Sequence, residues 1–249
     1  MLLIESLMVA LSTYSVIPVP NFNWNENNMK YAICFFPVIG VFCGILMWVL
    51  GLLNISSFFA SIIATCIPLL VTGGIHMDGF MDTVDALSSH RPKERKLEIL
   101  KDPNCGAFAC IYMGIYLLLS VGLFYEIYSL GCIFSVCPVF VLSRCVSTIC
   151  SVNLPNAKKE GMLLSYTKDV KKITVNITMS VVIILTIAVM LLISSYSCII
   201  PIVLGLLWII IYSIIVKKQF GGVTGDTAGF FLQIFELLAI FGIWIGAII

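Results

Sequence analysis

Three aspartates and a histidine lie close together in the sequence, where a long apolar stretch ends. Asp78, Asp82 and Asp85 stand at spacings i, i+4 and i+7, so they share one face if the segment after Gly79 is helical. Carboxylates on one face repel each other unless a positive charge lies between them. The chain has 13 acidic and 14 basic residues, so this concentration does not follow from an acidic composition. The pattern predicts a divalent metal site, with His76 beside it.

Other polar residues interrupt the apolar sequence elsewhere. Lys101 and Asp102 precede a small-residue turn at 103–107, and four glycines surround Asp226 in the segment 220–229. Glycine lets backbone approach a ligand closely. Arg144 lies within an apolar segment, where it can snorkel to the surface or face a cavity open to the cytoplasm. We expect these residues to converge on one cytoplasmic pocket.

Phosphoryl transfer is the reaction class that such a set would serve. Mg²⁺ held by carboxylates bridges phosphate oxygens, while basic side chains take up the remaining negative charge. Two metals about 4 Å apart would share three or four carboxylates. The candidate ligands are Asp78, Asp82 and Asp85, with help from Asp102 or Asp226. Arg144 and Lys101 are the candidate counter-charges.

Membrane helices are the elements that must position these residues. The chain of 249 residues is 60% apolar and 11% charged, with a mean hydropathy of +1.09, whereas about a quarter of the residues in soluble domains are charged. A bilayer core needs about 20 residues of helix. The uncharged stretches divide into seven spans: two within 31–75, then about 107–125 and 131–150, two within 173–216, and 230–249. We predict an all-α, polytopic membrane protein, 1–249, with a single domain.

Basic residues between the predicted spans fall in alternate connections. The basic loops cover about residues 76–106, 151–172 and 217–229, and the connections around Asn54, Tyr128 and Ser197 contain no Lys or Arg. With seven spans after residue 30, all three basic loops lie on one side, which the positive-inside rule makes cytoplasmic. The expected location is the cell membrane, with catalytic loops that face the cytoplasm.

The first 17 residues form a separate apolar piece. They include Glu5, and they have neither a basic start nor a small-residue cleavage pattern, so they fit a secretory signal poorly. An eighth span is the alternative, but the piece is short for one. We favour an interfacial or re-entrant helix.

The sequence resembles the cobalamin synthase family. The motifs that carry the resemblance are spread over nearly the whole chain and occur in the family's order. They are Phe35 to Gly40, Gly73 to Gly79 with Asp82 to Asp85, Lys101-Asp102 with Gly106 to Phe108, Ser143-Arg144, and Gly221 to Asp226. The chain departs from the family at 103–105, where a Ser-Arg-apolar sequence is common, and at Val16, where a basic residue is common. These departures put in doubt a phosphate role for those two places.

The resemblance implies a Mg²⁺-dependent transfer on a corrinoid. A ribose hydroxyl of α-ribazole, or of its 5′-phosphate, would attack the cobinamide-linked phosphorus of adenosylcobinamide-GDP. GMP would leave, and adenosylcobalamin or its 5′-phosphate would form. The implied partners are these substrates and the lipid bilayer, with no nucleic acid.

The same resemblance suggests roles for individual residues. Asp78 and Asp82 would hold Mg²⁺ on the diphosphate, while Asp85 would share the metal or accept the hydroxyl proton. His76 is a second candidate base, because the ordinary pKa of histidine lies near neutral pH. The candidates for substrate binding are Lys101, Arg144, Thr224 and Gly225.

Two other classes of membrane protein also use clustered carboxylates. A cation-coupled transporter would place ionisable groups near the bilayer midplane, whereas the aspartates here border the cytoplasmic loops. A CDP-alcohol or prenyl-type transferase would use the same carboxylate and metal chemistry with a different Asp spacing, and without a partner such as Thr224-Gly225-Asp226.

Overall fold

Helices form nearly all of the regular structure in the computed structural model, which describes residues 2–20, 24–158, 160–168 and 170–249. The α-helices are α1 (Leu2–Tyr14), α2 (Glu26–Met29), α3 (Phe36–Leu52), α4 (Ser57–Thr72), α5 (Ile75–Ser88), α6 (Lys93–Ile99), α7 (Ala107–Ser129), α8 (Val139–Asn153), α9 (Met162–Thr167), α10 (Lys172–Ser194), α11 (Ile199–Gln219) and α12 (Gly225–Ile248). Three 3₁₀ helices accompany them: η1 (Ala32–Phe35), η2 (Ile133–Val136) and η3 (Ser195–Cys198). The prediction of an all-α fold is confirmed.

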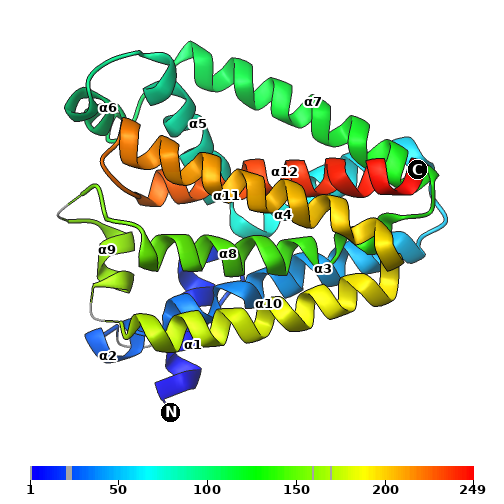
Figure 1. The fold of residues 1–249 in the computed structure, drawn as a ribbon, viewed down its shortest axis with the longest axis horizontal. Coiled ribbons are helices and arrows are strands. Elements are labelled where there is room, and N and C mark those ends of the chain that lie inside the picture. The colour runs from blue at the N-terminus through cyan, green and yellow to red at the C-terminus, as the bar shows by residue number, and fades with distance from the viewer. Residues whose placement is uncertain (1, 21–23, 159, 169) are drawn as a thin grey trace.

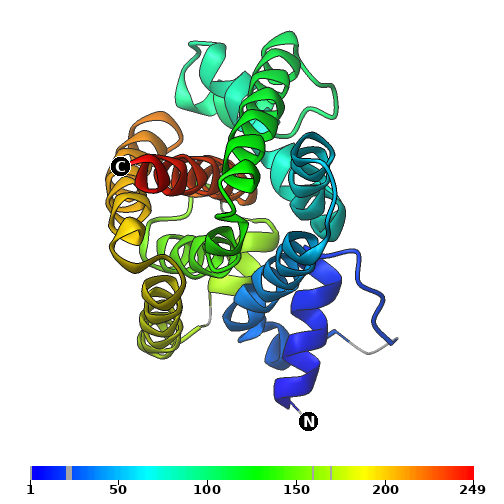
Figure 2. The ribbon, with the colours of Figure 1, turned by 90° about the vertical axis from the view of Figure 1, so that its right-hand side faces the viewer.

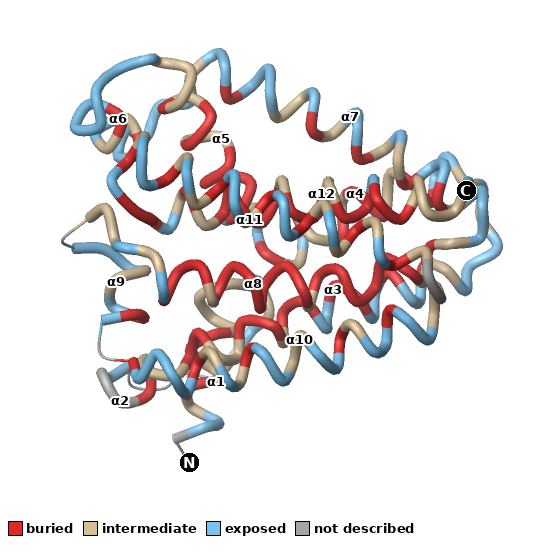
Figure 3. Tube along the Cα trace, in the orientation of Figure 1, coloured by how far each residue is buried: buried red, intermediate tan, exposed pale blue. Residues whose placement is uncertain are grey.

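Six helical segments of the described chain are long and apolar enough to cross a bilayer, and a seventh span results if the bent pair α4–α5 counts as one. These helices run roughly side by side along the long axis of the molecule (Figure 1). The large apolar side chains of Leu118 in α7 and Leu192 in α10 are exposed, as expected of surfaces that meet lipid. Exposed residues recur along both helices (Figure 3). The predicted number of about seven spans is therefore confirmed.

The connections that carry the basic residues contain short helices. Helices α5 and α6 occupy most of 76–106, α9 lies within 151–172, and α12 already begins at Gly225. Helices α6 and α9, which belong to two different basic segments, lie at the same end of the molecule (Figure 1). This agrees with the prediction that the basic segments share one side of the membrane. The helix after Gly79, on which the shared face of the aspartates depends, is present as α5.

Two glycines produce the sharp turn between α4 and α5. Gly73 has φ 63° and Gly74 has φ 80°, backbone conformations that glycine adopts without strain. The two helices meet at an angle of 94°. Helix α5 leaves the end of α4 at this steep angle and packs against α12. Asp78 therefore falls in the first turn of α5, earlier in a helix than the sequence suggested.

The N-terminal helix α1 is short and packs on the outside of the bundle (Figure 2). It has 13 residues, fewer than a bilayer core needs, and it exposes Leu3 and Ile4. The hydroxyls of Thr13 and Tyr166 are 2.7 Å apart, which ties α1 to α9. The prediction of an additional short N-terminal helix, distinct from the spans, is confirmed.

Small residues let α5 and α12 approach each other closely. A Cβ at Gly79 would lie 2.7 Å from the carbonyl oxygen of Asp226, and a Cβ at Gly229 would lie 2.8 Å from the carbonyl oxygen of His76. Such contacts exclude any side chain and permit backbone packing. The crossing brings two segments that are about 150 residues apart in sequence to the same place.

Substitution of Gly79, at the contact between α5 and α12, should destabilise the protein. We expect Gly79→Ala to lower the free energy of unfolding by about 1–3 kcal/mol, because the new methyl group must push the α12 backbone away. Unfolding of the detergent-solubilised chain would be measured by circular dichroism against denaturant. Gly114→Ala in α7 is the matched control, since a Cβ there meets nothing within 4 Å. Equal effects of the two changes would contradict the close crossing.

Candidate active site

Carboxylates from α5 and α12 interact at the crossing of these helices. The side chain of Asp82, in α5, is partly buried. Burial, followed by the negative charges of Asp78, Asp226 and Asp85, raises the pKa of Asp82 to about 6. The backbone of Asp226 lies directly against Gly79, which is between Asp78 and Asp82 in the sequence. The structure therefore brings Asp226 to the aspartates of α5; we call Asp78, Asp82 and Asp226 the carboxylate group.

The position of Asp226 is fixed by the start of α12. The Thr224 hydroxyl accepts a hydrogen bond from the Thr227 amide (3.1 Å), and the Thr227 hydroxyl accepts one from the Thr224 amide (2.8 Å). This reciprocal capping satisfies two amides and starts the helix at Gly225, which puts Asp226 in the first turn. The capping box is hard to recognise in the sequence, because Thr227 occupies the third position of the helix, where Glu or Gln is usual.

Lys158 is a residue of this site that the sequence analysis missed. Its Nζ donates a hydrogen bond to Asp226 Oδ2 at 3.0 Å, and both side chains are about three-quarters buried. Backbone hydrogen bonds hold the segment in place: Val223 donates to Pro155 (2.7 Å) and Ala157 donates to Val223 (3.0 Å). The sequence pattern of 158–172 predicts a topology signal, with attraction to lipid headgroups as a secondary effect, and the pairing with Asp226 distinguishes Lys158 from the other described lysines of this run.

Asp85 supports the start of α7. Its two carboxylate oxygens accept hydrogen bonds from the amides of Gly106 (2.5 Å) and Ala109 (2.9 Å). These amides belong to the first turn of α7 and would otherwise be unpaired. Its roles as metal ligand or base stay predictions, and either role would have to use oxygens that already bind two amides.

Lys101 and Asp102 are not part of the carboxylate group in this structure. Both side chains are exposed. Asp102 accepts hydrogen bonds from the amide (2.9 Å) and the side chain (2.7 Å) of Asn104, which lower its pKa. Asp102 is also absent from the charges that shift the pKa of Asp82. A role for either residue in metal or substrate binding would require this turn to move.

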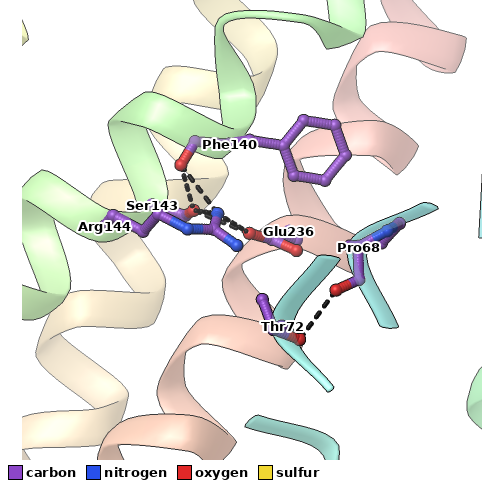
Figure 4. Close-up of polar contacts among 6 residues, drawn as sticks. All are labelled: Pro68, Thr72, Phe140, Ser143, Arg144 and Glu236. Carbon is purple, nitrogen blue, oxygen red and sulfur yellow. Dashed lines mark hydrogen bonds and ion pairs between the residues drawn. The ribbon is translucent and has the colours of Figure 1, made fainter. Parts of the chain in front are cut away.

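Arg144 lies inside the bundle and is paired with Glu236 (Figure 4). Arg144 is 0% exposed and Glu236 is 1% exposed. The Arg144 Nη1 donates to Glu236 Oε1 (2.7 Å) and to the Phe140 carbonyl (2.8 Å), and the Ser143 hydroxyl donates to the same Oε1 (2.8 Å). Arg144 therefore does not snorkel to the surface. Its Nε and Nη2 have no hydrogen-bond partner among the described residues, so the predicted phosphate contact would require a path to a guanidinium that is fully buried.

A cavity adjoins the carboxylate group. Its volume is about 180 Å³, and its lining comes from α1, η1, α3, α5, α8, α9 and α12. The lining residues include Asp78 and Asp226 as well as the predicted residues His76 and Gly225. His76 is 7% exposed, its Nε2 has no hydrogen-bond partner, and its ring contacts Phe36 edge-on at 5.4 Å. An imidazole in such apolar surroundings favours the neutral form.

The donor chemistry of the carboxylate group suits a hard divalent cation. Carboxylate oxygens are the ligands that Mg²⁺ prefers, and the raised pKa of Asp82 reflects charge that a cation would neutralise. In the part of the chain that is described, no three His, Cys, Asp or Glu side chains are already close enough together to hold a metal ion. Metal binding would thus require the carboxylates to turn toward a common centre.

Comparison with known proteins relates nearly the whole chain to one family. The model of the family described as Cobalamin-5-phosphate synthase matches residues 6–244. The chain is 41% identical to a protein of Lachnoclostridium phytofermentans, over 95% of this chain and 92% of that protein. It is 35% identical to one of Clostridium botulinum strain Alaska E43, over 96% of each chain. Both relatives are named adenosylcobinamide-GDP ribazoletransferase. No solved structure matches the chain significantly.

Loss of the buried ion pair should reduce stability. We expect Glu236→Gln to lower the free energy of unfolding by about 3 kcal/mol, because it leaves the Arg144 guanidinium buried without a counter-charge. Glu126→Gln on the exposed side of α7 is the matched control. The measurement is denaturant unfolding in detergent. A variant that unfolds like the wild type would show that the pair does not hold α8 to α12.

Proposed function

The chain belongs to the cobalamin-5-phosphate synthase family, and on this premise we propose that it transfers the adenosylcobinamide-phosphate moiety of adenosylcobinamide-GDP to α-ribazole or its 5′-phosphate. A ribose hydroxyl oxygen forms a new bond to the cobinamide-linked phosphorus. The bond between this phosphorus and the bridging oxygen breaks, and GMP leaves with that electron pair. The products are GMP and adenosylcobalamin, or adenosylcobalamin 5′-phosphate. The names of the relatives support this assignment.

In the structure, one observation carries this proposal: the carboxylate group lies beside a cavity. Asp78 and Asp226 both line the cavity, and Asp82 interacts with both of them. The group lies at the end of the bundle that carries the basic segments, which supports a site at the cytoplasmic face of the cell membrane. Phosphate chemistry needs this combination of anionic ligands and nearby cationic side chains.

Asp78, Asp82 and Asp226 are the residues that we expect to hold Mg²⁺. The ion would neutralise charge on the diphosphate and on the leaving GMP. Lys158 adds a protein cation next to Asp226, where its ammonium can bind a phosphate oxygen. Thr224 and Gly225, at the start of α12, border a smaller adjoining cavity together with Lys158.

His76 is the preferred acceptor of the hydroxyl proton. It lines the cavity, whereas each oxygen of Asp85 already accepts a backbone amide. The oxygens of Asp85 are thus already occupied by amides at the start of α7. The Nε2 of His76 has no hydrogen-bond partner among the described residues, so it can accept a hydrogen bond from the substrate hydroxyl.

The proposal predicts release of GMP that depends on both substrates and on Mg²⁺. Purified full-length protein in detergent would be incubated with adenosylcobinamide-GDP and α-ribazole, and GMP would be measured by chromatography. We expect GMP only when both substrates and Mg²⁺ are present, and none after chelation with EDTA. A folded sample that releases no GMP under any of these conditions would contradict the proposal and favour a transporter.

Removal of one carboxylate should abolish turnover without unfolding the protein. We expect Asp82→Asn to reduce GMP release by at least a hundredfold, because it removes an expected metal ligand and its charge. Circular dichroism would check that the variant is folded. Asp102→Asn is the matched control, and we expect it to stay within about twofold of the wild type because Asp102 is exposed outside the carboxylate group. Activity of Asp82→Asn within about tenfold of the wild type would exclude the metal assignment.

A further inference from the structure

The cavity beside the carboxylate group has features that phosphate chemistry does not explain. Three of its lining residues are aromatic, and their rings form a cluster. The ring centroids of Tyr14 and Phe36 are 4.6 Å apart, and those of Phe36 and His76 are 5.4 Å apart. Ile33 and Leu163 add apolar surface. Walls of this kind suit a flat, weakly polar ring, which can pack against aromatic side chains.

Two buried polar atoms in the cavity lining have no hydrogen-bond partner in the part of the chain that the structure describes. They are Nε2 of His76 and Oγ1 of Thr148, and Thr148 is only 1% exposed. Buried polar groups without partners are costly, so their presence in a cavity indicates a ligand that supplies the missing hydrogen bonds. Ser147 and Ser151 lie on the same part of α8 and also line the cavity.

We propose that this cavity binds the heteroaromatic base of the acceptor nucleoside, with the Thr148 hydroxyl as hydrogen-bond donor to a ring nitrogen. The proposal rests on the proposed function, because it takes the acceptor to be α-ribazole, a ribonucleoside with a benzimidazole base. Such a base has one free ring nitrogen and otherwise apolar edges. A volume of about 180 Å³ admits a planar bicyclic ring but excludes the corrin macrocycle.

The guanine base of the donor substrate fits this cavity less well. Guanine presents several N–H donors and requires matching acceptors. The carboxylates that line the cavity, Asp78 and Asp226, belong to the carboxylate group, and apart from His76 the remaining side chains of the lining are apolar or hydroxylic. An acceptor base seated here would place its attached ribose near the carboxylate group, where its hydroxyl must react.

Binding measurements without metal or corrinoid test this assignment. The probes are α-ribazole and GMP, titrated separately into full-length protein in detergent with EDTA. We expect Thr148→Val to weaken α-ribazole binding about tenfold, because the ring nitrogen loses its donor, and to leave GMP binding unchanged. Thr186→Val in α10 is the matched control: Thr186 is also buried but does not line the cavity, and we expect wild-type affinity.

A second measurement uses the wild-type protein and does not depend on the folding of a variant. A photoreactive azido-benzimidazole ribonucleoside should label peptides that contain 147–151 or 162–163, and excess α-ribazole should prevent the labelling while GMP should not. Labelling elsewhere, or loss of GMP binding alone in Thr148→Val, would overturn the proposal. If the wild type releases GMP normally but is labelled elsewhere, the assignment of the cavity to the acceptor base is overturned and the proposed function stays intact. Absence of GMP release together with labelling at 147–151 would instead contradict the function and support the nucleoside site.

Discussion

The buried ion pair between Arg144 and Glu236 is the interaction on which the arrangement of the central helices depends. It joins α8 to α12 within the bundle, and the rings of Phe36 and Phe140 lie near the guanidinium. Two charges removed from water are costly unless each is paired. Among the ways in which α8 and α12 can pack, those that separate Arg144 from Glu236 are therefore strongly disfavoured, and this sets which faces of the two helices meet.

The site is built outward from this fixed centre. Because α8 is held against α12, its Thr148 lines the cavity together with the first turn of α12. The glycines at 79 and 229 then allow α5 to lie directly on α12, which brings Asp82 within electrostatic range of Asp226. The backbone contact between 155–157 and Val223 adds Lys158. Binding residues from four distant segments thus depend on close backbone approach and on one buried charge pair.

Much of the fold could be predicted because membrane proteins obey strong one-dimensional rules. Apolar length defined the spans, and the alternation of Lys and Arg between connections defined their direction. The sequence also predicted the spacing of Asp78, Asp82 and Asp85. It did not predict the steep turn at Gly73 and Gly74 or the role of Asp85 at the start of α7, because these depend on which backbone groups meet across the fold.

By itself, the sequence determined the class of the protein, the place of the spans and the presence of clustered acids, because hydropathy and helical periodicity are local properties. Only the tertiary structure decided which charged residues belong together. Lys158 joined Asp226, whereas Asp102 stayed exposed and Arg144 was paired inside the bundle. Residues of the same type in the sequence differ in these ways because the packing of helices sets their burial and their distance to an opposite charge. These two quantities decide what a charged side chain can do.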